Sequence, residues 1–180
     1  LFLRLFISLL SRVLTFFCAS CSLKSRVFFY STLEKGRFNE NLDAVYEKCG
    51  YSKVIFRKEL PHRLTDVAKI RWYLMTSKVI VIDCELEYLR GIRLRPEQKV
   101  IQLWHKNGAF RRFGIDKNTT ESHFREYKNH SQYSDVAVTG EYVRQFYTHA
   151  FGIDYETVKA LGSPSTDALL TSDFVQVNRE

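Results

Sequence analysis

The chain has 180 residues, which is enough for one ordinary domain with a proper core, or for one domain and a tail. Its formal net charge is +7 and its sequence pI is about 9.3, so anionic partners are favoured: membrane headgroups, nucleotide phosphates or nucleic acid. The four cysteines lack the spacing of a disulfide-rich fold. The lone CxxC at residues 18–21 has no second CxxC and no nearby histidine pair, which argues against zinc.

Residues 1–23 are strongly apolar. A narrow polar stripe recurs there at helical spacing, within a wedge roughly 100° wide, and consists of Arg4, Ser8, Ser11, Arg12 and Thr15. Two arginines inside the run argue against a spanning helix, because each would cost about 2.5–3.5 kcal/mol at mid-bilayer. The pattern favours an amphipathic helix lying in a membrane interface. Three alternatives stay open: a signal peptide, the tail of an upstream transmembrane segment, and a helix buried against the following domain.

Strand and helix patterns alternate through the rest of the chain. Short apolar strands are expected at 27–31, 53–57, 78–83, 99–103, 135–140 and 158–161. Helices are expected at 41–49, 62–76, 119–130 and 141–151. The strand at 78–83 is nearly all apolar, as expected for a parallel strand covered on both faces. The alternation with short loops indicates an α/β fold with a Rossmann-like, doubly wound parallel sheet.

The most informative stretch is Lys99–Asp116, which reads KVIQLWHKNGAFRRFGID. Its β-branched run should end near Trp104 and His105. Asn107 and Gly108 then supply turn chemistry, because Asn and Gly tolerate the positive φ values of a sharp reversal. His105 is therefore expected at the carboxyl end of a central strand, where open parallel sheets bind their ligands.

Two chemical roles follow for this stretch. A histidine titrates near neutrality, so His105 can move protons. Arg111 and Arg112, just beyond it, offer fixed positive charge to a phosphate. The alternative for His105 is a hydrogen-bonded structural residue at a strand end.

Thr139 and Gly140 form a second candidate site. They end the strand expected at 135–140, immediately before the helix at 141–151. Free backbone N–H groups and the helix dipole make such a junction a natural anion site. The junction lacks GxGxxG, so it is not a dinucleotide fingerprint.

The spacing W-H-x-x-G-A-F-R-R-F-G at residues 104–114 resembles the CDP-glycerol glycerophosphotransferases of teichoic acid synthesis. Its form is most similar to the glycerol-phosphate primase branch, since the polymerase branch is expected to read W-H-G-T-P-L-K. The segment 162–167, G-S-P-S-T-D, is similar to the family's G-x-P-R-x-D, with Ser165 in place of the arginine. The resemblance runs in order through residues 26–170.

This resemblance implies the N-terminal half of a two-domain GT-B fold. Residues 1–23 would be the membrane-associating helix, 24–165 the acceptor-side domain, and 166–180 the start of a crossover to a C-terminal nucleotide-binding domain. That second domain would hold the donor, so the 180 residues alone are expected to be inactive.

The resemblance also implies an activity: transfer of glycerol phosphate from CDP-glycerol to an undecaprenyl-diphosphate-linked disaccharide at the cytoplasmic face of the membrane. No cofactor and no metal are expected. His105 matches the catalytic histidine and is the expected general base, with Arg111 and Arg112 on phosphates. The further substrate-binding candidates are Asn107, Gly108, Thr139 and Gly140, and the weaker acceptor-site candidates are Ser31, Arg37 and Asn39.

Two other functions stay open. A related GT-B enzyme could use CDP-ribitol or a nucleotide sugar, and a non-catalytic module could bind membranes through the first helix and the basic surface. Nucleic acid is less favoured as a partner because the basic residues are scattered rather than striped with aromatics. Three carboxylates follow the strand at 78–83, and one of them could orient a substrate hydroxyl or pair with His105: Asp83, Glu85 and Glu87.

Overall fold

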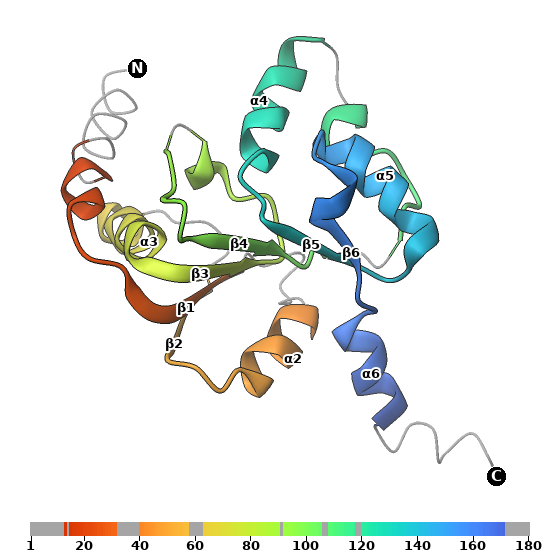
Figure 1. Ribbon diagram of the computed structural model, residues 1–180, viewed down its shortest axis with the longest axis horizontal. Helices are drawn as coiled ribbons and strands as arrows, with labels where there is room; N and C mark the ends of the chain where they lie inside the picture. Colours follow the sequence, from red (N-terminus) through yellow and green to blue (C-terminus); the bar gives the residue numbers. More distant parts are fainter. Residues whose placement is uncertain are drawn as a thin grey trace.

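The structure is a computed structural model that describes residues 13, 15–31, 40–57, 63–90, 92–105, 108–117 and 120–171. Six parallel strands form one sheet in the order β2-β1-β3-β4-β5-β6 (Figure 1). The strands are β1 (Lys24–Ser31), β2 (Lys53–Arg57), β3 (Ser77–Ile82), β4 (Lys99–Gln102), β5 (Asp135–Val138) and β6 (Val158–Ala160). The helices are α2 (Glu40–Lys48), α3 (Leu64–Thr76), α4 (Thr120–His130), α5 (Glu141–Phe151) and α6 (Pro164–Thr171). Short 3-10 turns are η1 (Glu87–Leu89), η2 (Gly114–Lys117) and η3 (Tyr155–Thr157).

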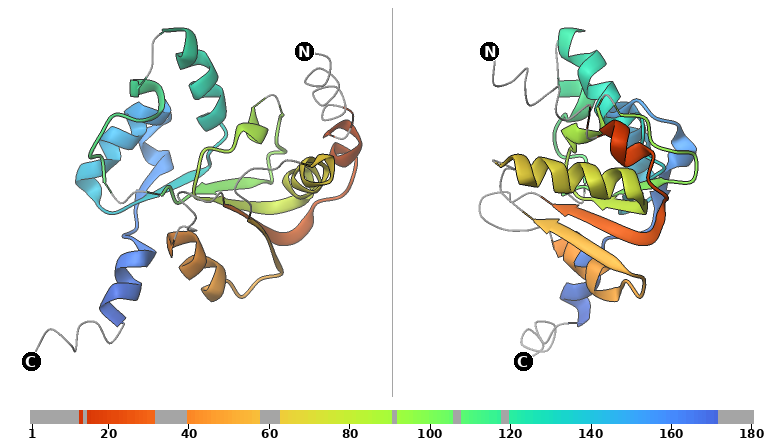
Figure 2. Two further views of the ribbon diagram at one scale, coloured as in Figure 1. Left: turned by 180° about the vertical axis from the view of Figure 1, so that it is seen from behind. Right: turned by 90° about the vertical axis from the view of Figure 1, so that its left-hand side faces the viewer.

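The strand order makes the sheet doubly wound. The chain steps from β1 outward to β2, returns past β1 to β3, and then moves steadily away through β4, β5 and β6. Because crossovers between parallel strands are right-handed, opposite directions place their helices on opposite faces. Figure 2 shows the result, with α2 and α6 on one side of the sheet and α3 and α4 on the other. The direction reverses between β1 and β3, which is the switch point of the sheet.

Alternation along the strands divides the core between these two faces. The larger cluster lies under α3 and α5 and takes the even-numbered strand positions: Phe28, Tyr30, Ile80, Ile82, Val100, Val136, Val138 and Val158. The smaller cluster lies under α2 and takes the odd-numbered positions: Val27, Phe29, Val79, Val81, Ile101 and Ala137. Side chains therefore cover both faces of the central strands, which explains their continuous apolar runs.

The expected α/β parallel sheet is confirmed, and the element bounds differ from the predicted ones by a few residues at most. At the end of α5, Gly152 adopts a left-handed conformation with φ of 62°, and its N–H donates to the carbonyl of His149. Helix α6 was not predicted. It begins at Pro164, directly after the segment that follows β6.

Residues 15–19 are helical and precede β1. The side chains of Phe16 and Phe17 are 73% and 66% exposed, whereas Cys18 is buried. The Arg95 guanidinium donates to the carbonyl oxygen of Ala19 at 2.7 Å, which fixes the end of this helix near the start of β4. No helix in the described part of the chain is long and apolar enough to cross a membrane. The helix predicted over 1–23 ends earlier than expected, since residues 20–23 form a turn that leads into β1. Residues 1–12 and 14 of that helix lie outside the described residues, and the proposed domain bounds stay a prediction.

Candidate functional site at the carboxyl edge of the sheet

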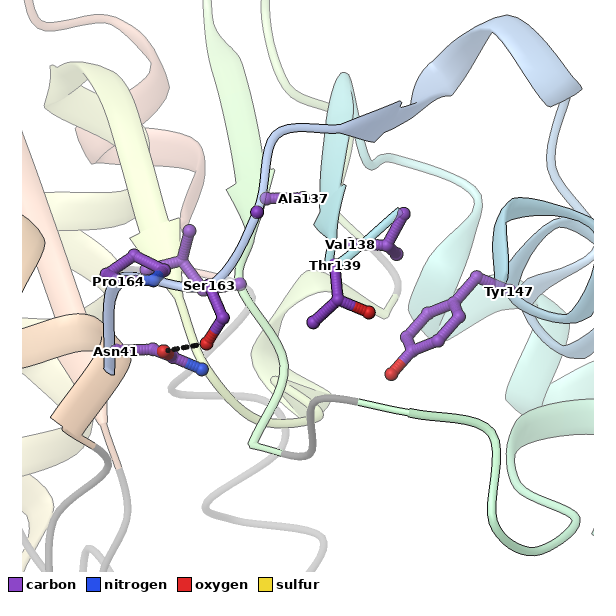
Figure 3. A pocket seen from close by; sticks show the side chains of 9 residues that line it. Asn41, Ala137, Val138, Thr139, Tyr147, Ser163 and Pro164 are labelled. Carbon is purple, nitrogen blue, oxygen red and sulfur yellow. Dashed lines mark hydrogen bonds between the residues drawn. The ribbon is translucent and has the colours of Figure 1, made fainter. Parts of the chain in front are cut away.

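A small hollow open to solvent lies where β4, β5 and β6 end (Figure 3). Asn41 and Ser163 lie on one side of it, and Tyr147 of α5 directs its hydroxyl toward it from the other. The remaining lining residues are Leu103, Ala137, Val138, Thr139, Gly162 and Pro164. The carboxyl edge of a doubly wound sheet is where such folds bind ligands.

His105 follows this edge directly. Its chain leaves β4 through Leu103, which lines the hollow, and Trp104. Trp104 has φ of 53°, a left-handed value that L-residues rarely adopt. Its ring is buried, and the ring of His105 lies against it with a centroid separation of 4.5 Å. His105 itself is half-buried.

The turn chemistry predicted for this loop needs a correction. The positive φ value belongs to Trp104, and Gly108 is not among the glycines with positive φ. The reason is tertiary, because the core holds the Trp104 ring and the backbone must turn there to let the chain leave the sheet. Asn107 lies outside the described residues.

The basic pair sits on a segment that folds back onto α5. Phe113 contacts the rings of Tyr147 and Trp104, with centroid separations of 4.9 and 5.7 Å. The contact between Trp104 and Phe113 closes the loop, so His105 and Arg112 leave the core from neighbouring points. Arg111 and Arg112 are both exposed there, as phosphate-binding side chains at the mouth of a site would be.

Gly114 makes the return of this segment possible. It has φ of 58°, and a Cβ atom on it would lie 1.9 Å from the carbonyl oxygen of Ala150 in α5. The backbones of Gly114 and Ala150 are therefore so close that no side chain fits between them. The glycine that ends the F-R-R-F-G sequence has a packing role, independent of any contact with substrate.

The Thr139–Gly140 junction has the predicted form. Gly140 is the N-cap of α5 in an extended conformation, and Thr139 lines the hollow. A Cβ atom on Gly140 would meet nothing within 4 Å, so the fold does not require glycine there. In the first turn of the helix, Glu141 pairs with Arg144 at 2.8 Å.

A buried acid lies at the switch point. Asp83 follows β3 and is 1% exposed, and the Ser31 hydroxyl at the end of β1 donates to its Oδ2 at 2.6 Å. Burial raises the pKa of Asp83 to about 6, although the hydrogen bond from Ser31 and the nearby Arg57 charge lower it. Two of the three carboxylates predicted to pair with His105 or a substrate thus have other partners. Asp83 accepts from Ser31, and Glu85 accepts from Asn129. Arg37 and Asn39 lie outside the described residues.

One histidine lies in the core. His130 is fully buried at the end of α4, against Phe151 and Tyr133. Burial lowers its pKa to about 4, so it is neutral at physiological pH. Among the described residues, no group of three or more His, Cys, Asp or Glu lies close enough to hold a metal ion.

Sequence reasoning also missed a polar link between α2 and α6 at one side of the hollow. Asn41 of α2 accepts hydrogen bonds from the Ser163 hydroxyl at 3.1 Å and from the backbone N–H of Ser165 at 2.9 Å. Asn41 thus caps the first turn of α6, although it belongs to another helix. The two partners are more than 120 positions apart in the chain, and no local pattern connects them.

A parallel, doubly wound sheet with helices on both faces defines a Rossmann-like α/β domain, and the predicted histidine and helix N-terminus both follow its carboxyl edge. Residues 20–180 match the family described as CDP-Glycerol:Poly(glycerophosphate) glycerophosphotransferase. The chain belongs to this family.

The similar proteins are teichoic acid polymerases and primases. A teichoic acid poly(ribitol-phosphate) polymerase of Bacillus spizizenii is 34% identical over 105 residues, covering 58% of this chain and 17% of that protein. The teichoic acid ribitol-phosphate polymerase TarK of Staphylococcus aureus is 28% identical over 87% of this chain and 33% of its own length. A teichoic acid glycerol-phosphate primase of Bacillus subtilis is 32% identical over 53% of this chain and 26% of its own length. The chain therefore spans a third or less of the length of these relatives.

Solved structures support the fold. The wall teichoic acid polymerase TagF, in a variant form, superposes with a TM-score of 0.65 at 18% identity, over 86% of this chain and 43% of that one. A further TagF structure, soaked with CDPG, gives a TM-score of 0.63 at 17% identity, over 86% of this chain and 42% of that one.

Proposed function

We propose that the protein carrying this chain transfers a polyol phosphate to a hydroxyl of a lipid-linked acceptor in teichoic acid synthesis, with CDP-glycerol as the first candidate donor. The observation that carries the proposal is the placement of His105. In a chain of this family, it comes directly after the left-handed turn at the carboxyl edge of β4. The basic pair Arg111 and Arg112 leaves the core beside it.

The chemistry assigns one task to each group. An acceptor hydroxyl attacks the phosphorus of the glycerol phosphate, an O–P bond forms, and the bond from that phosphorus to CMP breaks. His105 takes the hydroxyl proton as general base, and CMP leaves with the electron pair of the broken bond. Arg111 and Arg112 bind phosphate oxygens and offset their charge. Thr139, Gly140, Asn107 and Gly108 would complete the binding surface.

Donor identity is the finer part of the proposal. Glycerol-phosphate primases and ribitol-phosphate polymerases are both among the relatives, and one TagF structure was soaked with CDPG. CDP-glycerol and CDP-ribitol share the CDP group and differ in the polyol, so the region that binds the polyol decides between them. We place this chain as the acceptor-side domain of a GT-B enzyme, and we expect the 180 residues alone to show no turnover.

The deciding experiment is His105→Ala in the full-length protein. Transfer is measured with CDP-glycerol, and in parallel with CDP-ribitol, onto a polyprenyl-diphosphate-linked acceptor. Loss of a general base lowers the rate by about 100-fold to 10,000-fold. His123→Ala is the matched control, since His123 is exposed on α4, away from the hollow. If His105→Ala transfers at the wild-type rate, the assignment of His105 as general base is refuted. If the unaltered protein binds vesicles but transfers nothing, the non-catalytic membrane-binding module is favoured.

We further propose that the protein lies at the cytoplasmic face of the membrane as a peripheral protein. The exposed rings of Phe16 and Phe17 on the helix at 15–19 support this proposal, because an interfacial helix buries such side chains among lipid headgroups. The +7 net charge favours anionic lipid.

Vesicle flotation tests the membrane proposal. Phe16→Ser with Phe17→Ser should abolish binding to vesicles containing anionic lipid. Tyr51→Ser should not, since Tyr51 is 78% exposed but lies in the loop before β2. Equal flotation of both variants would contradict the proposal.

A further inference from the structure

The backbone of Trp104 is held in a conformation that it would not adopt alone. Its φ of 53° lies in the left-handed region, and it is the one described residue other than glycine with a positive φ. Such a conformation costs an L-residue about 1–2 kcal/mol, so it persists only where the surroundings fix it. The residue directly after Trp104 is His105, so whatever fixes this turn also sets the direction of the imidazole.

Two sets of contacts fix the turn. The Trp104 ring packs among three other rings, with centroid separations of 5.1 Å to Phe151, 5.7 Å to Phe113 and 6.5 Å to His130. The backbone N–H of Trp104 donates to the side-chain oxygen Oε1 of Gln102 at 2.8 Å. The ring contacts hold the side chain, and the hydrogen bond from Trp104 N–H to Gln102 holds the peptide at the turn.

The side-chain amide of Gln102 is held in one orientation. It is fully buried at the last position of β4. Its amide nitrogen donates to the carbonyl of Cys84 at 3.0 Å and to the Tyr133 hydroxyl at 3.1 Å. Because only the nitrogen can donate, these two acceptors orient the amide and leave Oε1 facing the N–H of Trp104.

The far end of this network is fixed as well. The Tyr133 hydroxyl accepts from Gln102 and is hydrogen-bonded to Nδ1 of His130 at 2.9 Å. Nε2 of His130 lies 3.4 Å from a carboxylate oxygen of Glu126. Glu85, on the facing loop, is another acid near Glu126. The network of hydrogen bonds thus connects Gln102 at the end of β4 to His130 at the end of α4.

We infer that Gln102 is a positioning residue: through the left-handed turn at Trp104 it sets the direction in which His105 leaves the carboxyl edge of the sheet. This inference rests on the proposed function, in which His105 is the general base. Gln102 touches neither substrate nor the reacting atoms. A displacement of about 1 Å of a catalytic group can cost about 100-fold in rate, which sets the effect expected when the turn relaxes.

The same strand offers a matched control. Gln98, 5% exposed, precedes β4 at the opposite edge of the sheet and also makes three hydrogen bonds. Its nitrogen donates to the carbonyls of Leu74 and Ser77, and its oxygen accepts from the N–H of Arg95. Gln98→Met and Gln102→Met therefore remove the same chemistry from equally buried positions at the two ends of one strand.

The experiment measures kcat, KM for the CDP-linked donor, and Tm for both variants of the full-length protein. We expect similar falls in Tm, a loss in kcat of about 10-fold to 100-fold with unchanged KM for Gln102→Met, and a kcat within about twofold of wild type for Gln98→Met. Equal kcat in the two variants at matched Tm overturns the inference.

Two further variants keep the result interpretable. If Gln102→Met does not fold, Tyr133→Phe takes its place, since it removes one of the two acceptors that orient the amide; wild-type kcat in Tyr133→Phe then counts against Gln102. His105→Ala is measured alongside. If it remains active, the proposed function fails. If it is inactive while Gln102→Met keeps the kcat of Gln98→Met, only the positioning role fails.

Discussion

Replacing Gly114 by alanine should be among the most destabilising small changes in this domain. Two penalties combine there. A left-handed backbone costs an alanine about 1–2 kcal/mol, and a Cβ atom 1.9 Å from the carbonyl oxygen of Ala150 forces the loop away from α5. Overpacking of this kind costs about 1–3 kcal/mol, so the total is about 2–5 kcal/mol.

Alanine substitutions at two other glycines distinguish the cost of the left-handed backbone from the cost of the steric overlap. Gly162 has φ of 89° but open space where a Cβ would lie, so Gly162→Ala should cost about 1–2 kcal/mol from the backbone alone. Gly50 has open space and no positive φ, so Gly50→Ala should change stability by less than about 1 kcal/mol, in the stabilising direction.

Thermal unfolding of the three variants is the assay. For a domain of this size, Gly114→Ala should lower Tm by about 10 °C, with Gly162→Ala intermediate and Gly50→Ala close to wild type. If Gly114→Ala and Gly162→Ala lower Tm equally, the close approach of the 108–117 segment to α5 makes no contribution, and the reasoning is refuted.

Further predictions concern pH and the polar link. Burial raises the pKa of Asp83 to about 6, so the protonated carboxyl contributes stability that is present below pH 4 and lost as pH rises through 6. Burial lowers the pKa of His130 to about 4, so the neutral imidazole contributes stability that is present above pH 6.5 and lost as pH falls through 4. Asp83→Asn should be more stable than wild type at pH 7, by up to about 3 kcal/mol, because the variant has no carboxylate to ionise in the core. This difference in the free energy of unfolding should be smallest at pH 4, and urea unfolding at pH 4 and pH 7 measures it. His130→Gln should show the opposite trend, with stability that falls from pH 4 to pH 6 relative to wild type, and a flat difference would contradict the assigned burial effect. Asn41→Ala removes the acceptor that caps α6 and should cost about 1–2 kcal/mol, whereas Asn41→Asp keeps an acceptor and should stay near wild type; limited proteolysis in α6 reports the difference.

Much of the site could be located from sequence because its residues lie near the ends of strands. His105 follows an apolar run, and Thr139 precedes a helix, so both were expected at the carboxyl edge, and both lie there. The positive φ value expected at Gly108 was wrong because turn propensity is local, while the φ of Trp104 is set by rings from other elements; Asn107 lies outside the described residues.

Buried polar groups were beyond sequence reasoning for a related reason. A glutamine at a strand end, a tyrosine after a helix and a histidine on an apparently polar helix face give no signal that they bond one another. His130 and Tyr133 are close in sequence, but Gln102 reaches them only because β4 and β5 are neighbours in the sheet.

Apart from α6, the sequence by itself determined the order and type of the main helices and strands, the parallel α/β class and the family, because these depend on hydrophobic periodicity and on one contiguous motif. The tertiary structure alone decided how His105 is aimed. It placed the strain at Trp104, gave Gln102 its role, and made Gly114 indispensable to the return of the 108–117 segment. The physical reason is that periodicity reports which face of an element is buried, whereas the partner of a buried hydrogen bond or the closeness of two backbones depends on elements far apart in the chain.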